Sequence, residues 1–139
     1  MSARIGARIV RLEEATSTNT LILEREEWLD EPGLVVLARH QTAGRGRVGR
    51  RWVSLPGAQL QFSVVIHPRV RPEELAVASL VAGLSVAEAI ERELALAPRL
   101  KWPNDVLAAG RKVSGILIES KPGKAGQARL VVGIGINCQ

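Results

Sequence analysis

A stretch rich in glycine and arginine, residues 40–51, is the part of the sequence best suited to chemistry. It holds three glycines, four arginines and almost no apolar side chains, so it cannot bury itself and is predicted to be a loop. Glycines let backbone N–H groups approach a phosphate closely, and arginines bind phosphate oxygens with two N–H groups at once. The loop is therefore expected to bind an anion, with a solvated basic surface loop as the alternative.

Within this stretch, Gly44–Gly49 matches the G-x-G-x-x-G pattern of dinucleotide-binding proteins. In those proteins a strand precedes the glycines, a helix follows them, and an acidic residue comes roughly 20 positions later. A strand is expected before the loop, but residues 51–57 cannot begin a helix, and no carboxylate lies between Phe62 and Glu73. The pattern therefore does not mark a dinucleotide-binding helix.

Three further blocks carry residues suited to binding or catalysis. The first has K-W-P-N-D at Lys101–Asp105, followed by R-K-V-S-G-I-L-I-E at Arg111–Glu119. The others read S-T-N at Ser17–Asn19 and G-I-G-I-N at Gly133–Asn137. Together with the glycine loop, and in this order and spacing, the blocks closely resemble the catalytic domain of biotin protein ligases over about residues 15–137.

The blocks differ in how specific they are. S-T-N is a weak motif, the loop sequence G-R-G-R-V-G-R is strong, and K-W-P-N-D followed by R-K-V-S-G-I-L is the strongest. Lipoate ligases and transferases share the superfamily, but the arginine loop and K-W-P-N-D favour biotin.

The resemblance implies a reaction in two steps. The carboxylate of biotin attacks the α-phosphate of ATP, which releases pyrophosphate and gives biotinyl-5′-AMP. A lysine of the biotin carboxyl carrier protein, part of acetyl-CoA carboxylase or a related carboxylase, then attacks this mixed anhydride. Both steps depend on cations placed against developing negative charge. Mg²⁺ is expected to arrive with ATP and to keep most of its waters, so no metal-ligating residues are predicted.

The resemblance places biotin against residues from several parts of the chain: Ser17, Thr18, Asn19, Gln41, Trp52 and Gly115. Hydroxyls and the N–H groups at the start of a helix suit the ureido ring of biotin, which both donates and accepts hydrogen bonds. The alternatives are an ordinary N-cap for Ser17–Asn19, a solvated position for Gln41 and core packing for Trp52. Gly115 is expected to allow a close approach of the backbone.

For the nucleotide and the adenylate, the resemblance implies contacts with Arg45, Gly46, Arg47, Lys112 and Asn137. The predicted catalytic residues are Lys112, to neutralise the biotin carboxylate and α-phosphate, Arg45, to bind the phosphate, and Asp105, to orient or deprotonate the acceptor lysine. The alternatives are a surface lysine at Lys112, a turn residue at Asp105 and a frayed end at Asn137.

These residues must be positioned by alternating strands and helices. Strands are predicted at residues 8–12, 34–38, 60–66, 99–102, 106–108, 112–119 and 129–136. One helix is expected to begin at Ser17–Asn19 and run to about Leu29, and a second to run from Pro72 to about Leu94. This order predicts an α+β fold, a mixed β-sheet with helices packed on it, and the resemblance implies a class II aminoacyl-tRNA synthetase-like core. Trp28 and Trp102 are expected in the core.

The composition limits the class of protein. With 139 residues and 46% apolar content, the chain is predicted to form one folded domain, residues 1–139. The net charge of +5 favours anionic partners, but an aromatic content of 3% argues against a nucleic-acid binder. A single cysteine, and no secretory or membrane-spanning segment, indicate a cytoplasmic protein.

Biotin protein ligases often have further segments. Some begin with a DNA-binding domain, and most continue past G-I-G-I-N into an SH3-like domain; neither is expected here. We therefore expect no DNA or membrane partner. The alternative to a ligase is a module that retains biotin or biotinyl-AMP without efficient transfer. A homodimer is expected if an exposed sheet edge pairs with a second copy.

Overall fold

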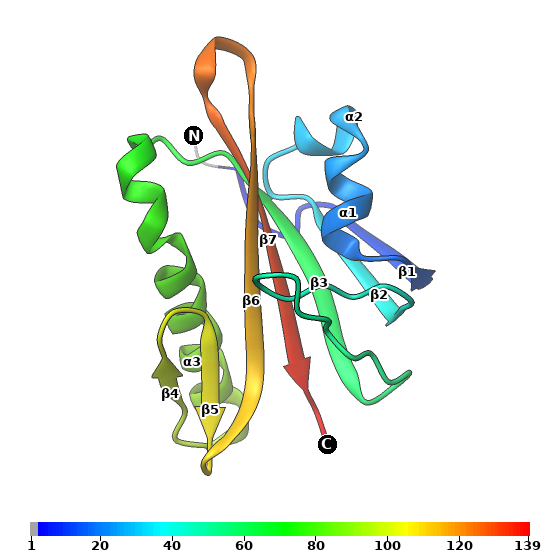
Figure 1. Ribbon diagram of the computed structural model, residues 1–139, viewed down its shortest axis with the longest axis vertical. Coiled ribbons are helices and arrows are strands. Elements are labelled where there is room, and N and C mark those ends of the chain that lie inside the picture. The colour runs from blue at the N-terminus through cyan, green and yellow to red at the C-terminus, as the bar shows by residue number, and fades with distance from the viewer. Residues whose placement is uncertain (1–2) are drawn as a thin grey trace.

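A seven-stranded β-sheet forms the centre of the structure, a computed structural model that describes residues 3–139 (Figure 1). The first two residues of the predicted domain lie outside this range. The strands lie in the order β1-β2-β3-β7-β6-β5-β4. Their bounds are β1 Ile9–Ala15, β2 Val35–Gln41, β3 Gln59–Ile66, β4 Arg99–Lys101, β5 Asp105–Ala108, β6 Arg111–Pro122 and β7 Ala128–Asn137. β1 and β2 pair in parallel and the other neighbours are antiparallel, which confirms the predicted mixed sheet.

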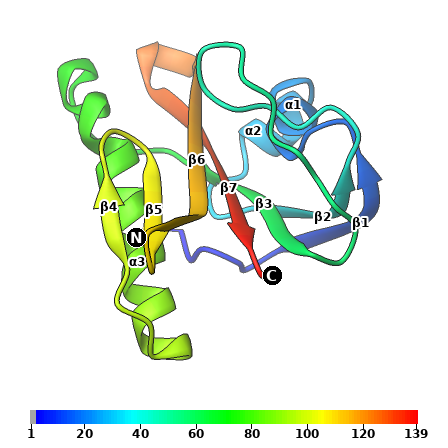
Figure 2. The same ribbon diagram turned by 60° about the horizontal axis from the view of Figure 1, so that its bottom comes forward.

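Helices cover both faces of the sheet, and the alternation of residues along β7 shows which helix covers which face. The helices are α1 Thr18–Leu23, α2 Glu26–Leu29, the 3₁₀ helix η1 Pro72–Val77, α3 Ala78–Leu94 and the short 3₁₀ turn η2 Lys124–Gly126. Val131 belongs to a buried cluster with residues of α1 and α2, whereas Leu130 and Val132 pack with α3. Because successive strand residues point to opposite faces, α1 and α2 lie on one face and α3 on the other (Figure 2).

The helix predicted from Pro72 to Leu94 is present, but its first turns are the 3₁₀ helix η1 and the regular helix begins only at Ala78. α3 buries residues at helical spacing, Gly83, Val86, Ala87 and Ile90, against the half of the sheet that contains β5 and β6. Among residues 3–139, no helix is long and apolar enough to cross a membrane.

The single helix predicted to run to Leu29 is wrong in one respect, because it is interrupted at Arg25. Arg25 has an extended backbone, with φ −121° and ψ 100°, between α1 and α2. Lys121 Nζ donates a hydrogen bond to the Leu23 carbonyl at 2.7 Å, and the Arg25 guanidinium lies 4.8 Å from the centre of the Trp28 ring. The hydrogen bond from Lys121 satisfies a carbonyl of the last turn of α1 from outside the helix, and the helix ends there.

The loop predicted for residues 40–51 begins later than expected. β2 continues through Gln41, which pairs with Ala15 of β1. The remaining segment, residues 42–52, is called the basic loop below. It folds back on itself, because Arg45 and Arg51 form an isolated antiparallel bridge. The loop therefore has a defined backbone shape, which fixes the positions from which its arginine side chains extend.

Candidate functional site

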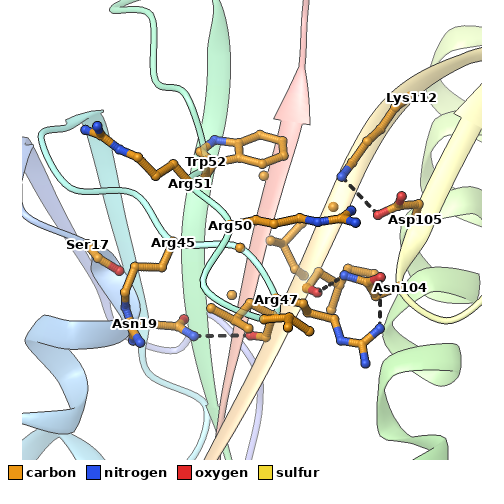
Figure 3. Close-up of a pocket in the computed structure, with 18 of the residues that line it drawn as sticks. Ser17, Asn19, Arg45, Arg47, Arg50, Arg51, Trp52, Asn104, Asp105 and Lys112 are labelled. Carbon is orange, nitrogen blue, oxygen red and sulfur yellow. Dashed lines mark hydrogen bonds and ion pairs between the residues drawn. The ribbon is translucent and has the colours of Figure 1, made fainter.

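A pocket of about 420 Å³ opens on the face of the sheet that carries α1 (Figure 3). Its walls come from the start of α1, the basic loop, the turn between β4 and β5, and the strands β6 and β7. β7 contributes Gly133 and Gly135, which follow Val131 on the same face at intervals of two residues. The pocket therefore lies where α1 begins and the basic loop crosses the sheet.

The floor of the pocket is made by glycines and one tryptophan. A Cβ atom added at Gly135 would lie 2.6 Å from Trp52 Cε2, and one added at Gly115 would lie 3.1 Å from Trp52 Cζ3. The indole therefore rests directly on the backbone of β6 and β7, so it lines the pocket and is packed at the same time. Its Nε1 is buried and has no hydrogen-bond partner within residues 3–139.

The start of α1 forms one side of the pocket, called the α1 side. Ser17 Oγ accepts a hydrogen bond from the Thr20 N–H at 3.4 Å, so Ser17 is the N-cap of α1. The Thr18 N–H donates to Gln41 Oε1 at 2.8 Å, and the Thr18 hydroxyl lies 2.6 Å from the Ser63 hydroxyl. Gln41 is thus not a solvated loop residue, because it ends β2 and holds the first turn of α1.

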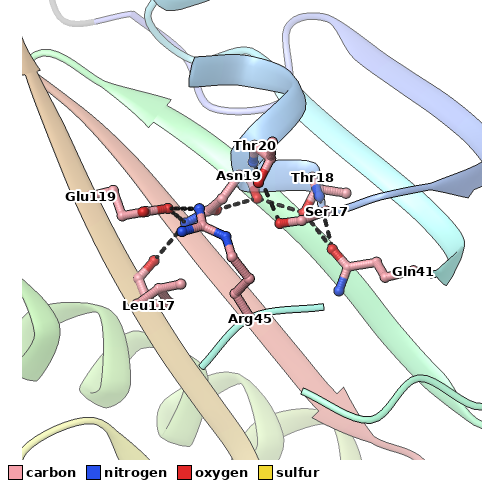
Figure 4. Close-up of polar contacts among 9 residues, drawn as sticks. Ser17, Thr18, Asn19, Thr20, Gln41, Arg45, Leu117 and Glu119 are labelled. Atoms are coloured by element: carbon pink, nitrogen blue, oxygen red, sulfur yellow. Dashed lines mark hydrogen bonds and ion pairs between the residues drawn. The ribbon is translucent and has the colours of Figure 1, made fainter. Parts of the chain in front are cut away.

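Asn19 is the most fully bonded side chain on the α1 side (Figure 4). Its Oδ1 accepts from Ser63 Oγ at 2.6 Å, and its Nδ2 donates to the Leu117 carbonyl at 3.1 Å and to Glu119 Oε2 at 3.0 Å. A Cβ atom added at Gly133 would lie 2.5 Å from Asn19 Oδ1, so only glycine leaves room for this amide. Both Asn19 N–H groups are engaged by β6, and the side chain joins α1 to the sheet.

Lys112 and Asp105 lie on the opposite side of the pocket, called the lysine side (Figure 3). Lys112 Nζ is 3.0 Å from Asp105 Oδ1 and 5.8 Å from the centre of the Trp52 ring. The lysine is half-exposed and the aspartate is mostly buried. Asn104 Nδ2 donates to the Ile116 carbonyl at 2.8 Å, which fixes the turn between β4 and β5 against β6. The ammonium is therefore held at the pocket rather than free in solvent.

The arginines of the basic loop are divided between the two sides (Figure 3). Arg45 points to the α1 side, where its Nη2 lies 2.5 Å from Glu119 Oε2. Arg47 and Arg50 point to the lysine side, and Arg47 Nη1 is 3.5 Å from Asn104 Oδ1. Sequence reasoning chose Arg45 as the first ligand of a phosphate, whereas the structure brings Arg47 and Arg50 closer to Lys112.

Asn137 lies at the end of β7 and does not line the pocket. Its Nδ2 donates to the Lys112 carbonyl at 3.1 Å, and its Oδ1 accepts from Gln59 Nε2 at 3.0 Å. The residue is therefore part of the sheet rather than a frayed end, and its contact with the site passes through the backbone of Lys112.

Of the two tryptophans expected in the core, one is there and one is not. Trp28 is partly buried and packs against the cluster beneath α1 and α2, as predicted. Trp102 is 72% exposed, so its prediction is wrong. It lies in the turn that connects β4 to β5, where Pro103 and Asn104 follow it and the chain reverses direction at the mouth of the pocket.

Sequence reasoning missed three polar residues of the site: Gln61, Ser63 and Glu119. Gln61 and Ser63 are buried in β3, where Gln61 Oε1 accepts from Gln41 Nε2 at 3.1 Å. The pattern Q-L-Q-F-S in residues 59–63 places polar residues at alternate positions of an otherwise apolar strand, and this signal indicates a polar face.

The charge of the pocket lining is strongly positive. Its lining contains six cationic side chains and one carboxylate, Asp105: the cations are Arg45, Arg47, Arg50, Arg51, Lys101 and Lys112. Within residues 3–139, no three His, Cys, Asp or Glu side chains gather as metal ligands do. Such a lining favours an anion, and the buried hydroxyls and amides of the α1 side favour a neutral polar group beside it.

Comparison with known proteins agrees with this geometry. Residues 12–137 match the biotin/lipoate A/B protein ligase family, and the chain belongs to that family. It is 42% identical over 126 residues to the biotin–[acetyl-CoA-carboxylase] ligase of Mycobacterium tuberculosis, covering 87% of this chain and 46% of the relative. It is 40% identical over 133 residues to the bifunctional ligase/repressor BirA of Escherichia coli, covering 95% and 41%.

Solved structures show the same fold. The biotin protein ligase of Aquifex aeolicus in complex with biotin and ATP aligns with a TM-score of 0.75 at 40% identity, covering 94% of this chain and 52% of that one. The ligase of Leishmania major with biotinyl-5-AMP aligns with a TM-score of 0.77 at 30% identity, covering 94% and 57%. The predicted fold class, that of the biotin ligase catalytic core, is confirmed. The chain spans about half the length of the relatives it matches.

Proposed function

We propose that this chain forms biotinyl-5′-AMP from biotin and ATP and transfers the biotinyl group to a lysine of a biotin carboxyl carrier protein. One observation carries the proposal: a single pocket joins a buried network of hydroxyls and amides to a cluster of six cations. Biotin has a neutral ureido ring at one end and a carboxylate at the other, and the adenylate adds a phosphate next to that carboxylate. The names and bound ligands of the relatives support biotin over lipoate.

The ureido ring is proposed to bind on the α1 side. Ser17, Thr18 and Gln41 present hydroxyl and amide groups there, and Asn19 fixes the position of this helix start. The apolar remainder of biotin would lie over Trp52 and along the backbone at Gly115, where the absence of a side chain leaves depth. In this position biotin contacts the face of the Trp52 ring and needs no hydrogen bond from the buried Nε1.

The carboxylate and the α-phosphate are proposed to meet on the lysine side. Lys112 and Arg47 supply the cations there, and the guanidinium of Arg45 is proposed to contribute from the α1 side. Gly46 lines the pocket between these arginines, with its N–H bonded to the Arg50 carbonyl. As the carboxylate oxygen attacks the α-phosphorus, negative charge grows on the phosphoryl oxygens and on the leaving pyrophosphate. Fixed cations stabilise this charge more than they stabilise the ground state, which lowers the barrier.

The transfer step is proposed to use Asp105. An anion that binds Lys112 weakens the ion pair between Lys112 and Asp105, and the carboxylate can then accept a proton from the attacking lysine amine. The nitrogen forms an amide with the biotinyl carbonyl carbon, and AMP leaves with the electron pair of the broken carbon–oxygen bond. Asn137 is proposed to support the nucleotide half through the Lys112 backbone. Mg²⁺ would enter with the ATP phosphates, and Asp105 is the one carboxylate in the lining near them.

A binding module that retains biotinyl-AMP without transferring it is the alternative. It is not favoured, because the relatives that match this chain are named ligases. The two functions are separated by incubating the protein with ATP, Mg²⁺, biotin and an apo carrier domain, and by following pyrophosphate and biotinylated carrier. Formation of both products supports the ligase, and formation of pyrophosphate alone supports the binding module. If neither product forms, the proposal is contradicted.

The proposed partners are the carrier domain and a second copy of the chain, in the cytoplasm. Support for a homodimer comes from exposed apolar side chains on the outer side of α3, Val81 at 60% and Leu84 at 50% exposed. Light scattering at micromolar concentration tests the dimer, and a monomeric mass would contradict it. No DNA-binding role is proposed.

A further inference from the structure

One carboxylate connects the basic loop to the α1 side of the pocket (Figure 4). Glu119 Oε2 lies 2.5 Å from Arg45 Nη2 and accepts a hydrogen bond from Asn19 Nδ2 at 3.0 Å. Its side chain is 25% exposed and that of Arg45 is 43% exposed, so the pair is partly shielded from water. A single oxygen atom of β6 therefore contacts both the loop and the first turn of α1.

Other contacts fix the two ends of the basic loop, but few hold the residues between them. At its start, the Thr42 N–H donates to the Ala15 carbonyl at 2.9 Å and the Ala43 N–H donates to the Thr16 carbonyl at 2.8 Å. At its end, Trp52 packs on the glycines of β6 and β7. At its centre, Arg47 reaches Asn104 only at 3.5 Å, which is at the limit of a hydrogen bond. Bonds within the loop, such as the Gly46 N–H to the Arg50 carbonyl at 2.7 Å, shape the loop but do not attach it to the sheet. Beyond Ala43, the ion pair between Arg45 and Glu119 is therefore the main side-chain contact that attaches the loop to the sheet.

We propose that Glu119 is a positioning residue that anchors the basic loop across the pocket and couples it to Asn19. With Arg45 anchored on the α1 side, Arg47 and Arg50 remain on the lysine side, where the phosphate is proposed to bind. A group that binds at the start of α1 acts on Asn19, and through the shared carboxylate it also acts on the loop. The identity of the ligand in the pocket rests on the proposed function, but the anchoring of the loop by Glu119 is a property of the ligand-free protein.

The first test uses limited proteolysis of the ligand-free protein with trypsin, which cleaves after the arginines of the loop. Glu119→Gln keeps the size of the side chain and a carbonyl oxygen for Asn19, but it removes the charge that holds Arg45. We expect cleavage within residues 45–51 to become about 3- to 10-fold faster, because proteolysis follows the population of the detached loop. An unchanged cleavage rate would overturn the anchoring.

Glu31→Gln is the matched control for this experiment. Glu31 also pairs with an arginine, Arg8, at 2.5 Å, but away from the pocket. It should leave cleavage of the loop unchanged, and thermal unfolding should confirm that both variants are folded. Raising the salt concentration to about 1 M should narrow the difference between Glu119→Gln and the unsubstituted protein, because the ion pair is partly exposed.

The second test measures how long the adenylate stays bound in the complete reaction. Glu119→Gln and Arg45→Gln should each speed its release by about 3- to 10-fold, and the double variant should be no faster than either one. Additive effects in the double variant would show that the two residues act separately and would refute the coupling. If no adenylate forms in any variant, the proposed function fails while the proteolysis result still decides the anchoring.

Discussion

Lys112 is a half-exposed lysine whose ammonium contacts a carboxylate and an aromatic ring. Asp105 Oδ1 lies 3.0 Å from its Nζ, and the centre of the Trp52 ring lies 5.8 Å away. A flexible lysine loses side-chain entropy when it is held in this way, so the contacts position it before a ligand arrives. An incoming anion then meets a cation that is already in place, and Asp105 is released for a different hydrogen bond.

Replacing Lys112 by alanine removes this cation from the lysine side. We expect adenylate formation to fall by on the order of 10²- to 10³-fold, because one preorganised group that stabilises the developing charge is lost. Pyrophosphate release in the presence of biotin and ATP is the measurement. Lys124→Ala, in the turn η2 and away from the pocket, is the control and should retain full activity. A rate for Lys112→Ala within twofold of the control would exclude the proposed role.

Gly135→Ala tests the floor of the pocket. The added methyl group would lie 2.6 Å from Trp52 Cε2, so the indole must move into the space above it. Biotin affinity should fall about 10-fold or more, in line with the cost of overpacking a tight contact, and titration calorimetry would measure it. Gly83→Ala is the control: on the other face of the sheet, its Cβ would meet the ends of two side chains, Leu100 at 3.3 Å and Ile116 at 3.5 Å. Equal affinities in the two variants would mean that biotin does not use this floor.

The residue types of the site were predictable from the motifs, but their pairings were not. Lys112, Asp105 and Trp52 come together as the sequence blocks imply. The bonds of Asn19 depend on β3 and β6 lying on either side of β7 at Gly133, which is a property of the strand order rather than of any local pattern. The exposure of Trp102 was missed for the same reason, because apolar type alone does not report where a turn places a side chain.

At the scale of elements, α2 depends on a contact with the sheet. It has only four residues, too few to be stable alone. Arg129 of β7 lies 2.7 Å from Glu26 and 2.8 Å from Asp30, and it donates to the Pro122 carbonyl at 2.9 Å. The hydrogen bond from Arg129 lowers the pKa of Glu26, and the same bond raises the pKa of Arg129. This cluster joins α2 to the sheet behind the α1 side of the pocket.

Arg129→Met should therefore lower the midpoint of thermal unfolding at pH 7 by about 3–8 °C. Because the pKa of Glu26 is lower in the folded chain than its ordinary value of 4.5, its contribution is complete above that value and is lost as the pH falls through the lowered pKa. The difference between the variant and the unsubstituted protein should shrink at pH 3. Calorimetry at both pH values checks this, and a difference that grows in acid would contradict it.

Arg92→Met is the matched control for that measurement. Arg92 pairs with Glu93 at 2.9 Å, but both side chains are well exposed on α3. Its loss should change the midpoint by at most about 2 °C at either pH, since exposed pairs contribute little.

The strands were the most predictable elements, because alternation of polar and apolar residues reports them directly. The break in the helix at Arg25 was not predictable, since Lys121, which caps α1, is 98 residues away from Leu23. Local sequence around Arg25 contains neither glycine nor proline.

At the scale of the whole molecule, the net charge of +5 is concentrated where it can act on a ligand, because the pocket lining alone has six cations and one carboxylate. Raising the salt concentration from about 0.05 to 0.5 M should weaken ATP binding by on the order of 10-fold. An uncharged biotin amide should bind with nearly the same affinity at both concentrations. Equilibrium binding of the two ligands measures this, and parallel salt dependences would mean that the cations do not contact the nucleotide.

The central strand β7 has one consequence for how a protein of this fold can change. Its residues alternate between the packing beneath α3, at Leu130 and Val132, and the pocket floor, at Gly133 and Gly135. Substitutions at Leu130 and Val132 change the stability of the domain, and substitutions at Gly133 and Gly135 change which ligands fit the pocket. Because the two sets occupy opposite faces of the same strand, ligand size and robustness can evolve largely independently within ten residues of chain.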